Sequence, residues 1–478
     1  MGVVTKMKFS EISKSHYLCC TFNFFRLRKL IDEDLLYLQV RLSEYFEIVS
    51  GFAFSSKDYA TEGVSICRIS DISKYNELLI DEMLKLPEEY VDDYSRFIIQ
   101  NSDILIGLTG DGKFFKTCFV ENLDISILLN QRVGIIRVKQ NVKNVSPKFV
   151  SLLFNSNKVQ NQIRIVAMGK TQKNVSPFDI LNVKIPKLDY NTQIELLQII
   201  EPIETEITNL KTSKLKPLNI INKVFSEAFD VPLDMVTELD KTNKLTVKFS
   251  NINANNSHLR SGMRWNKMQF IQDKLYEKID SIKVLGNYIK NTKNGWSPLS
   301  VEDGEGTPVL GQEHFAFDGV VKIEPSKFTE ETRNNIEDFY IKKGDFFVSR
   351  GNTVDLVALA SIVQDEVIDD ILFPDLYIKI EFDETELNQE YIAYLFNSFF
   401  GRLYFKYVAK GKNQTMVKIS SGELLNFRFP LPNKKKQAEI VEKIKIQIDA
   451  QNLIDQQIEQ KQQQINVIIE NAINTEGT

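Results

Sequence analysis

Two short polar loops contain side chains that could bind a nucleic acid. They span residues 169–173 (Gly-Lys-Thr-Gln-Lys) and residues 411–415 (Gly-Lys-Asn-Gln-Thr). A lysine can pair with a phosphate, a Gln or Asn side chain can form two hydrogen bonds to an adenine edge, and a glycine allows close approach of the backbone. The two loops therefore predict contacts to the phosphates and bases of DNA.

Each loop lies in a long stretch without acidic residues. The chain of 478 residues has 64 Asp and Glu residues and a net charge of −5, yet residues 125–178 and 391–422 contain neither. The first stretch carries nine Lys and Arg residues and the second carries five. This pattern is typical of a local phosphate-binding surface, although any single lysine can equally be an ordinary solvated side chain.

The candidate site consists of residues in and around these stretches, together with residues that follow predicted strands. The predicted DNA contacts are Arg68, Lys113, Arg164, Lys170, Thr171, Gln172 and Lys173 in the first half of the chain, and Gln312, Arg350, Lys406, Lys410, Lys412, Asn413 and Gln414 in the second. The sequence leaves open which of them contact bases and which contact phosphates.

The two loops are related by an internal duplication. At an offset of 242 residues, Leu-Phe-Asn-Ser at 153–156 matches 395–398, and Gln172 matches Gln414. A two-residue insertion follows in the second copy, after which Gln193 matches Gln437. A period of this length indicates two copies of a whole domain with its connector, because solenoid repeats are far shorter.

Each copy predicts the same series of elements to position its loop. Strands are expected at 64–69 and 101–106, and at 307–310 and 343–348, followed by a helix that carries Leu-Phe-Asn-Ser. A capped short helix begins after Ser176 and after Ser420, and a strand follows at 183–186 and at 427–430. Each copy then ends in a long helix. The apolar seam of the first helix is Ile200, Ile203, Ile207 and Leu210, and that of the second is Ile454, Ile458, Ile465 and Ile468.

The spacing of these seams favours an antiparallel coiled coil between the two helices, with kinks at Pro202 and Pro217. Two separate core helices remain the alternative. The predicted fold class is α+β, with two similar α/β domains separated by the two helices in a pseudo-two-fold arrangement. The predicted boundaries are a first domain at 1–190 with an extension at 1–30, a helix at 191–226, a linker at 227–262, a second domain at 263–432 and a helix at 433–478.

Signatures of catalysis are missing from the sequence. There is no phosphate-binding loop of the G-x-x-x-x-G-K-[ST] type, no dinucleotide fingerprint and no nucleophile elbow. The four cysteines lack metal-ligand spacing, the three histidines are scattered, and no apolar run is long enough to span a bilayer. We therefore expect a cytoplasmic protein without catalytic activity, metal or cofactor.

The duplicated set of motifs resembles the DNA specificity subunit of type I restriction–modification systems. In each copy a Gly-x-x-Gln loop is followed by a capped helix, an Ile-Pro or Phe-Pro strand and a Gln, here at 169–172, 185–186 and Gln193, and at 411–414, 429–430 and Gln437. The turn between 306–310 and 319–321 and the run at 264–266 are also similar to the family. The resemblance covers roughly residues 42–470, and the chain departs from the family at 1–30, 226–263 and 187–189.

This resemblance implies a non-catalytic subunit that reads a bipartite DNA target, with one target recognition domain for each half-site. The paired helices would act as a ruler, and half-sites about one helical turn or about 34 Å apart would place both domains on one face of double-stranded DNA. The implied partners are two methyltransferase subunits, which bind S-adenosylmethionine, and restriction subunits that use ATP to translocate DNA. Two alternatives remain: a recognition subunit of another phage-defence methylase, and a coiled-coil scaffold that binds proteins.

Overall fold

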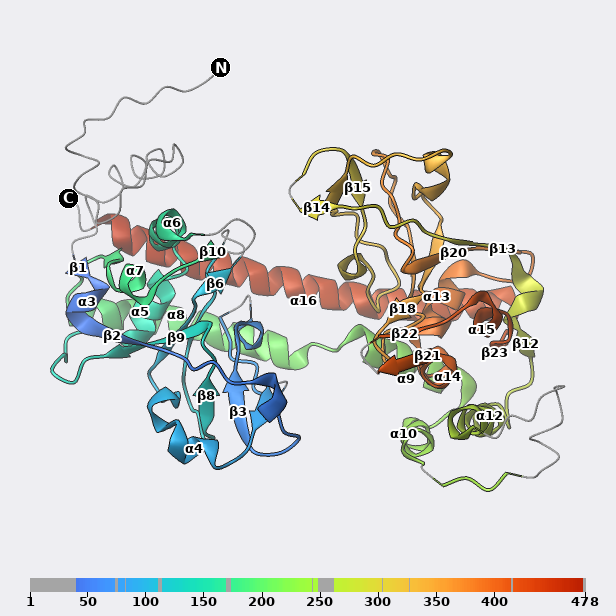
Figure 1. Ribbon diagram of the computed structural model, residues 1–478, viewed down its shortest axis with the longest axis horizontal. Coiled ribbons are helices and arrows are strands. Elements are labelled where there is room, and N and C mark those ends of the chain that lie inside the picture. Colours follow the sequence, from blue (N-terminus) through green and yellow to red (C-terminus); the bar gives the residue numbers. More distant parts are fainter. Residues whose placement is uncertain are drawn as a thin grey trace, which may run out of the picture. The chain divides into compact units, whose positions relative to one another are not determined.

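The computed structural model (Figure 1) describes residues 40–73, 76–81, 83–110, 114–168, 173–242, 244–247, 262–302, 304–325, 327–413 and 416–475. The chain forms two compact units. The first unit consists of Met1–Thr212 with Gln456–Thr478, and the second unit consists of Ser213–Asp455. The predicted extension at 1–30 lies outside the described residues.

The first unit is built on two sheets. A four-stranded antiparallel sheet has the order β2 (Phe46–Ser50), β9 (Val133–Val138), β5 (Ile104–Gly107) and β7 (Thr117–Phe119). A three-stranded sheet has the order β4 (Leu84–Leu86), β3 (Val64–Cys67) and β8 (Ile127–Leu129). The apolar run of β5 is fully buried, because Leu105 packs in one cluster with residues of the second sheet and α5 (Pro147–Leu153) also contacts β5.

The second unit repeats this plan. Its four-stranded sheet has the order β13 (Ile289–Asn294), β20 (Tyr377–Phe382), β17 (Phe346–Ser349) and β19 (Ala360–Ile362). Its three-stranded sheet has the order β14 (Val301–Glu302), β16 (Lys327–Thr329) and β15 (Thr307–Val309). Ile104 lies opposite Ile136 and Phe119, and 242 residues later Phe346 lies opposite Ile380 and Ile362. The matching register confirms the duplication.

The Leu-Phe-Asn-Ser motif lies at the junction of two helices in each unit, so no single helix carries all four of its residues as expected. In the second unit its Leu, Phe and Asn end the earlier helix, whereas in the first unit only its Leu does so. In the first unit α5 ends at Leu153 and α6 spans Asn157–Val166. In the second unit α13 (Gln389–Asn397) is followed by α14 (Phe399–Val408). The serine of each motif caps the following helix, because the Ser156 hydroxyl accepts from the Val159 N–H and the Ser398 hydroxyl accepts from the Phe400 N–H, both at 3.3 Å.

The capped short helices and the strands after them are present as predicted. They are α7 (Pro177–Leu181) and α15 (Ser421–Leu425), each with a capping box formed by the preceding serine and an acid three residues later. β11 (Lys184–Ile185) pairs with β1 (Val40–Arg41), and β23 (Arg428–Pro430) pairs with β12 (Ile282–Val284). These pairings lead the chain into the long helices.

The first long helix is broken where the sequence predicted only kinks. α8 (Tyr190–Ser213) continues through Pro202, and a new helix, α9 (Pro217–Phe229), begins with Pro217 at its first position. The predicted linker also contains structure that the sequence did not reveal. Its residues include α10 (Leu233–Lys241), which precedes α12 (Met263–Leu275).

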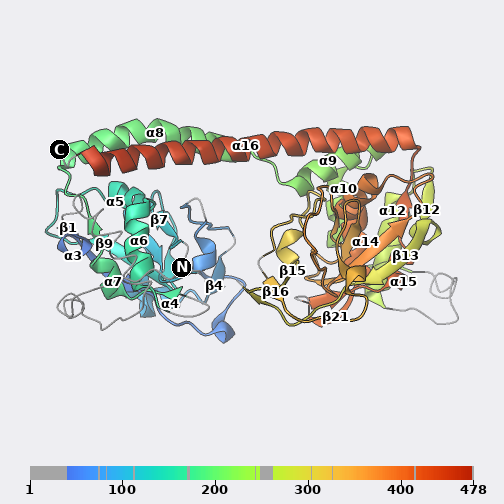
Figure 2. The same cartoon turned by 90° about the horizontal axis from the view of Figure 1, so that it is seen from above.

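The last helix, α16 (Lys434–Thr475), contributes to both units, since the boundary between them falls within it. In the first unit α8 and the second half of α16 lie side by side in both views (Figures 1 and 2), with an ion pair between Glu206 and Lys461. The Glu470 carboxylate also accepts from the Asn157 N–H at 2.9 Å. In the second unit the Lys214 ammonium pairs with Asp455 at 2.5 Å, and α9 contacts α13. Glu206 contacts Lys461, whereas Lys214, which comes later in the chain, contacts the earlier residue Asp455. This is the order of contacts that an antiparallel pairing predicts.

A buried glutamine anchors each long helix to its unit. The Gln193 side chain accepts from the Ser146 N–H at 2.8 Å and donates to the Leu188 carbonyl at 2.9 Å. The Gln437 side chain accepts from the Asn388 N–H at 2.8 Å and donates to the carbonyls of Glu386 and Pro432 at 2.9 and 2.8 Å. The two glutamines that match in the sequence repeat thus make equivalent hydrogen bonds to the backbone in both units.

An acid likewise fixes the central strand of each four-stranded sheet; it is buried in the first unit and partly buried in the second. Asp103, before β5, accepts from the Arg137 guanidinium at 2.7 and 2.6 Å. Asp345, before β17, pairs with the Lys379 ammonium at 2.6 Å. The Asp103 hydrogen bonds raise the pKa of Arg137 above its ordinary value, against the opposing effect of burial.

Candidate nucleic-acid interface

A short three-stranded sheet in the second unit gathers most of the predicted contacts of that half. It has the order β18 (Gly351–Asn352), β22 (Met416–Lys418) and β21 (Lys410–Asn413), so Lys410, Lys412 and Asn413 lie on one strand of it. Arg350 directly precedes β18. We call this sheet the second ribbon. Gln414 follows β21 and lies outside the described residues.

Backbone contacts hold Arg350 and Gln312 beside the second ribbon. The Gln312 amide donates to the Gly351 carbonyl at 3.0 Å, and the Arg350 N–H donates to the Leu376 carbonyl at 2.6 Å. The Arg350 side chain is half-buried, and its guanidinium lies 3.4 Å from the Asp375 carbonyl. A guanidinium that contacts only carbonyl oxygens keeps its charge available for a phosphate or a guanine edge.

The first unit has a smaller version of this arrangement, which we call the first ribbon. It pairs β6 (Thr109–Gly110) with β10 (Lys173–Asn174), and the Thr109 hydroxyl donates to the Asn174 side chain at 2.8 Å. Met168 and Asn174 exchange two backbone hydrogen bonds beside this pairing. Lys173 therefore lies on the ribbon, while Lys113, Lys170, Thr171 and Gln172 lie outside the described residues.

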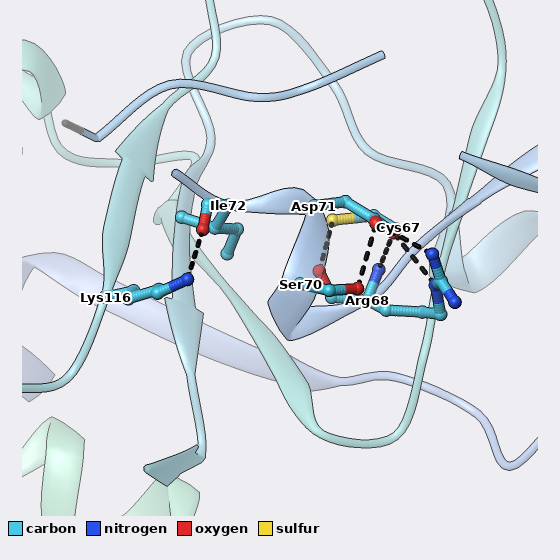
Figure 3. Close-up of polar contacts among 6 residues, drawn as sticks. All are labelled: Cys67, Arg68, Ser70, Asp71, Ile72 and Lys116. Atoms are coloured by element: carbon cyan, nitrogen blue, oxygen red, sulfur yellow. Dashed lines mark hydrogen bonds and ion pairs between the residues drawn. The ribbon is translucent and has the colours of Figure 1, made fainter. Parts of the chain in front are cut away.

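Arg68 lies on the loop after β3 and is paired within its own loop (Figure 3). Its guanidinium donates to both carboxylate oxygens of Asp71, at 3.1 and 3.0 Å, and these bonds raise the pKa of Arg68. The neighbouring Ile72 carbonyl accepts from the Lys116 ammonium at 2.8 Å, as Figure 3 also shows. Because Asp71 is almost fully buried and already compensates its charge, Arg68 is a weaker candidate for a phosphate contact than Arg350.

Arg164 and Lys406 occupy equivalent positions, 242 residues apart, near the ends of α6 and α14. The Arg164 guanidinium donates to the Asn161 side chain at 3.0 Å, and its Nε is buried without a hydrogen-bond partner. The Lys406 ammonium instead pairs with Asp240 of α10 at 2.8 Å. The structure thus brings neither residue onto a ribbon, although each lies on the helix that leads toward one.

The two stretches without acidic residues do not form surfaces without acidic residues, which corrects the simplest reading of the sequence. Acids from elsewhere in the chain pair with several of their cations. The pairs are Arg137 with Asp103, Lys148 with Glu121 and Glu204, Lys406 with Asp240, and Lys410 with Glu423. Charge along a sequence therefore overstates the free positive charge of the folded units.

Sequence reasoning missed Lys418 on β22. Its side chain is exposed, and Lys418 lies opposite both Gly351 and Lys410 in the second ribbon. Lys418 belongs to the second stretch without acidic residues, so the sequence pattern that identified the other candidates also includes it. A narrow two- or three-stranded ribbon with Lys and Arg side chains suits the major groove of B-DNA, which admits a β-ribbon.

Two structural features are absent from the part of the chain that the structure describes. Within those residues, no group of three or more His, Cys, Asp and Glu side chains is arranged to hold a metal ion. None of the described helices is both long and apolar enough to cross a bilayer.

Comparisons with known proteins give consistent results. The MjaVIII type I restriction enzyme specificity subunit of Methanocaldococcus jannaschii is 22% identical over 191 residues, which are 38% of this chain and 44% of the relative. The EcoKI type I restriction enzyme specificity subunit of Escherichia coli is 22% identical over 406 residues, which are 82% of this chain and 77% of the relative. The first match thus spans less than half of its relative.

Among solved structures, the S subunit of a type I restriction-modification system from M. genitalium aligns over 90% of this chain and 94% of its own, with 13% identity and a TM-score of 0.34. A structure of a type I R-M system aligns over 91% and 97%, with 15% identity and a TM-score of 0.38. Because both TM-scores are below 0.5, these structures do not establish the family, and the assignment rests on a family model that is matched to the amino-acid sequence. The model of the type I restriction modification DNA specificity domain matches residues 37–217 and 282–466, and since these regions make up most of the sequence, the chain belongs to that family and contains two copies of its domain.

Proposed function

We propose that the chain is the DNA-reading subunit of a type I restriction–modification complex and that each unit reads one half of a bipartite target. The observation that carries this proposal is the repetition of one scaffold with two different ribbons. β5 and β17 share a register, whereas among the described residues the first ribbon carries Lys173 and the second carries Arg350, Lys410, Lys412 and Lys418. Two scaffolds that are alike and two reading surfaces that differ suit a target with two unlike halves.

Within this proposal the first ribbon and residues 169–172 contact one half-site, and the second ribbon with Gln312 and Arg350 contacts the other. We keep the boundaries expected from the sequence as part of the proposal, with recognition domains at 1–190 and 263–432. Lysines supply phosphate contacts, which set affinity and salt dependence, while Gln, Asn and Arg side chains supply base contacts.

The paired helices α8 and α16 are proposed to fix the spacing of the two half-sites as a coiled-coil ruler. Their exposed faces are proposed to dock methyltransferase subunits, two of them because the internal repeat offers two similar surfaces. Restriction subunits would join the same complex. The chain itself would carry out no chemical step, since the partners would supply the methyl transfer and the DNA translocation.

The primary test is selection from a randomised duplex library. The chain, co-expressed with its cognate methyltransferase, is incubated with the library, and the retained DNA is sequenced. Two short motifs at a fixed spacing are the expected result. Retention that depends on salt but selects no motif would indicate a non-specific DNA scaffold, and no retention by an assembled complex would favour a protein-binding scaffold.

A domain exchange tests the assignment of one unit to one half-site. Residues 42–190 are replaced by the matching region of a relative with a different target, and the selection is repeated. We expect one motif to change while the other motif and the spacing persist. A change in both motifs would refute the assignment.

Deletion of two helical turns from α8 tests the proposal that the paired helices set the spacing of the half-sites. An unaltered spacing with full activity would refute it.

A further inference from the structure

Three side chains of the second unit converge beside the end of α14. Lys267 comes from α12, and Lys406 and Tyr407 come from α14. The Lys267 ammonium lies 4.8 Å from the centre of the Tyr407 ring, and the Lys406 ammonium lies 5.9 Å from it. Lys267 is only 6% exposed, so a positive charge is held in a largely closed place.

The carboxylate of Asp240 lies among these groups. It accepts from the Lys406 ammonium at 2.8 Å and from the Tyr407 hydroxyl at 2.7 Å, and the Asp240 carbonyl accepts from the Lys267 ammonium at 2.6 Å. Burial acts to raise the pKa of Asp240, but the hydrogen bonds from Lys406 and Tyr407 outweigh it and hold that pKa below its ordinary value. A negatively charged oxygen atom is therefore well accommodated at this point.

The helix that carries Asp240 buries few of its side chains. α10 has nine residues, and of these only Leu239 is buried. The side chains of Asp240 and Lys406 are each 32% exposed, and an ion pair of this kind contributes little to stability because water and salt screen it. A stronger anion could displace the Asp240 carboxylate without unfolding the unit.

The first unit shows the same position without such a carboxylate. Arg164, the equivalent of Lys406, donates to an uncharged partner, Asn161, and no acidic residue within the described ranges forms an ion pair with it. One unit therefore presents a cation at the end of this helix, whereas the other has its cation neutralised by α10. The two cations have different access to solvent anions although the scaffold is the same.

We propose that Lys267, Lys406 and Tyr407 form a binding site for a backbone phosphate of DNA in the second unit, and that Asp240 on α10 occupies this site until DNA displaces it. The Lys406 ammonium and the Tyr407 hydroxyl are donors that bind a phosphate oxygen, and the Asp240 carboxylate occupies the position of that oxygen. The Lys267 ammonium, which donates to the Asp240 backbone carbonyl, adds positive charge beside it. The inference rests on the proposed function, because it takes DNA as the ligand of the second unit. α10 thus acts as an intramolecular cover of part of the interface.

The test compares two substitutions on α10. Asp240→Asn removes the competing charge, and Glu238→Gln is the matched control because it removes the same charge from an exposed residue of the same helix. The full chain with its methyltransferase is titrated with a duplex carrying the selected target, across a series of salt concentrations. We expect Asp240→Asn to tighten binding about twofold to fivefold and to steepen the logarithmic salt dependence by about one unit, with no change for Glu238→Gln.

A double variant identifies the groups responsible. Lys406→Gln in the Asp240→Asn background should abolish the gain, since the phosphate would lose its main partner. Inorganic phosphate, added without DNA, should raise the melting temperature of Asp240→Asn more than that of the unmodified chain if the site accepts any phosphate. If only DNA shows the difference, the site depends on the neighbouring contacts of a duplex. Asp240→Ser is a second variant with the same expected gain, should Asp240→Asn unfold.

The inference is wrong if Asp240→Asn binds DNA like the Glu238→Gln control, or if its gain survives the loss of Lys406. Weaker binding by both Asp240 variants with intact folding would show that the Asp240 contacts only support the structure. The proposed function fails separately, when the unmodified chain with its methyltransferase selects no DNA motif at all.

Discussion

The two units use the same internal contacts to hold different outer surfaces. Gln193 and Gln437 bind equivalent backbone groups, and Asp103 and Asp345 each pair with a cation of the neighbouring strand. The first ribbon has two strands and the second has three, and only the second unit shows an acid pairing with the cation at the end of the equivalent helix among the described residues. The scaffold thus uses the same glutamine bonds to the backbone and the same acid–cation pairs in both units, while the outer surfaces differ.

Removal of the acids before β5 and β17 should destabilise the two units to different extents. Asp103 is nearly inaccessible and accepts two hydrogen bonds from Arg137, whereas the Asp345 side chain is 12% exposed and pairs with a flexible lysine. We expect Asp103→Ala to lower the free energy of unfolding by about 4 kcal/mol and Asp345→Ala by about 2 kcal/mol, because each substitution leaves a partly buried cation without its partner. Urea titration measures both, with exposed Asp124→Ala as the control. Equal losses would contradict the ranking.

The glutamine anchors should differ by one hydrogen bond. Gln437 makes three bonds to the backbone and Gln193 makes two. Gln437→Ala should therefore cost about 3 kcal/mol of unfolding free energy and Gln193→Ala about 2 kcal/mol, since each leaves buried backbone groups unpaired. Gln447→Ala on the exposed face of α16 is the matched control and should change little. Losses as small as that of the control would show that the anchors are dispensable.

Removal of Arg350 should affect the DNA-reading surface of the second unit and leave that of the first unchanged. Arg350→Ala should weaken binding to the selected target by about 1–3 kcal/mol and relax the preference at the second half-site alone. Binding titrations against duplexes with single changes in either half measure this. Lys283→Ala, exposed on β12 of the same unit, serves as the control. A relaxed preference at the first half-site would show that the units do not read separate halves.

The reactivity of the cysteine thiols reports on the opening of the first unit only. All four cysteines belong to the first unit, and burial raises the pKa of Cys67 and raises that of Cys118 to about 12. With Cys19 and Cys20 replaced by Ser, alkylation near pH 8 should proceed only as fast as the first unit opens. Because the thiols ionise more readily when unfolded, their stabilising contribution is present below about pH 8.5 and is lost as the pH rises further. Rapid alkylation of folded protein would contradict the burial.

Much of the scaffold could be predicted from the sequence, because its signals are local. The capping patterns at Ser176 and Ser420 predicted the short helices that follow them, and the offset of 242 residues predicted the repeated sheet. Gly344, just before β17, has a positive φ of 85°, a conformation that glycine adopts readily in turns. Even the break before Pro217 was signalled by the proline, although the sequence suggested a kink instead of a new helix.

The interface was less predictable, because it depends on pairs that are distant in the chain. β6 pairs with β10 across more than sixty residues, and Asp240 reaches Lys406 across 166 residues. No local pattern shows which acid will neutralise which lysine. The polar composition after residue 226 suggested a linker, and it concealed α10, whose helix depends on packing of Leu239 and a few partly buried neighbours.

The sharing of α16 between the units has a consequence for synthesis on the ribosome. The second unit is a continuous segment, Ser213–Asp455, whereas the first is completed only by Gln456–Thr478. Its contacts from Glu206 to Lys461 and from Asn157 to Glu470 must wait until the whole second unit has been translated. The unit that is made first is therefore finished last, and a nascent chain exposes the apolar face of α8, including Ile207, throughout that interval.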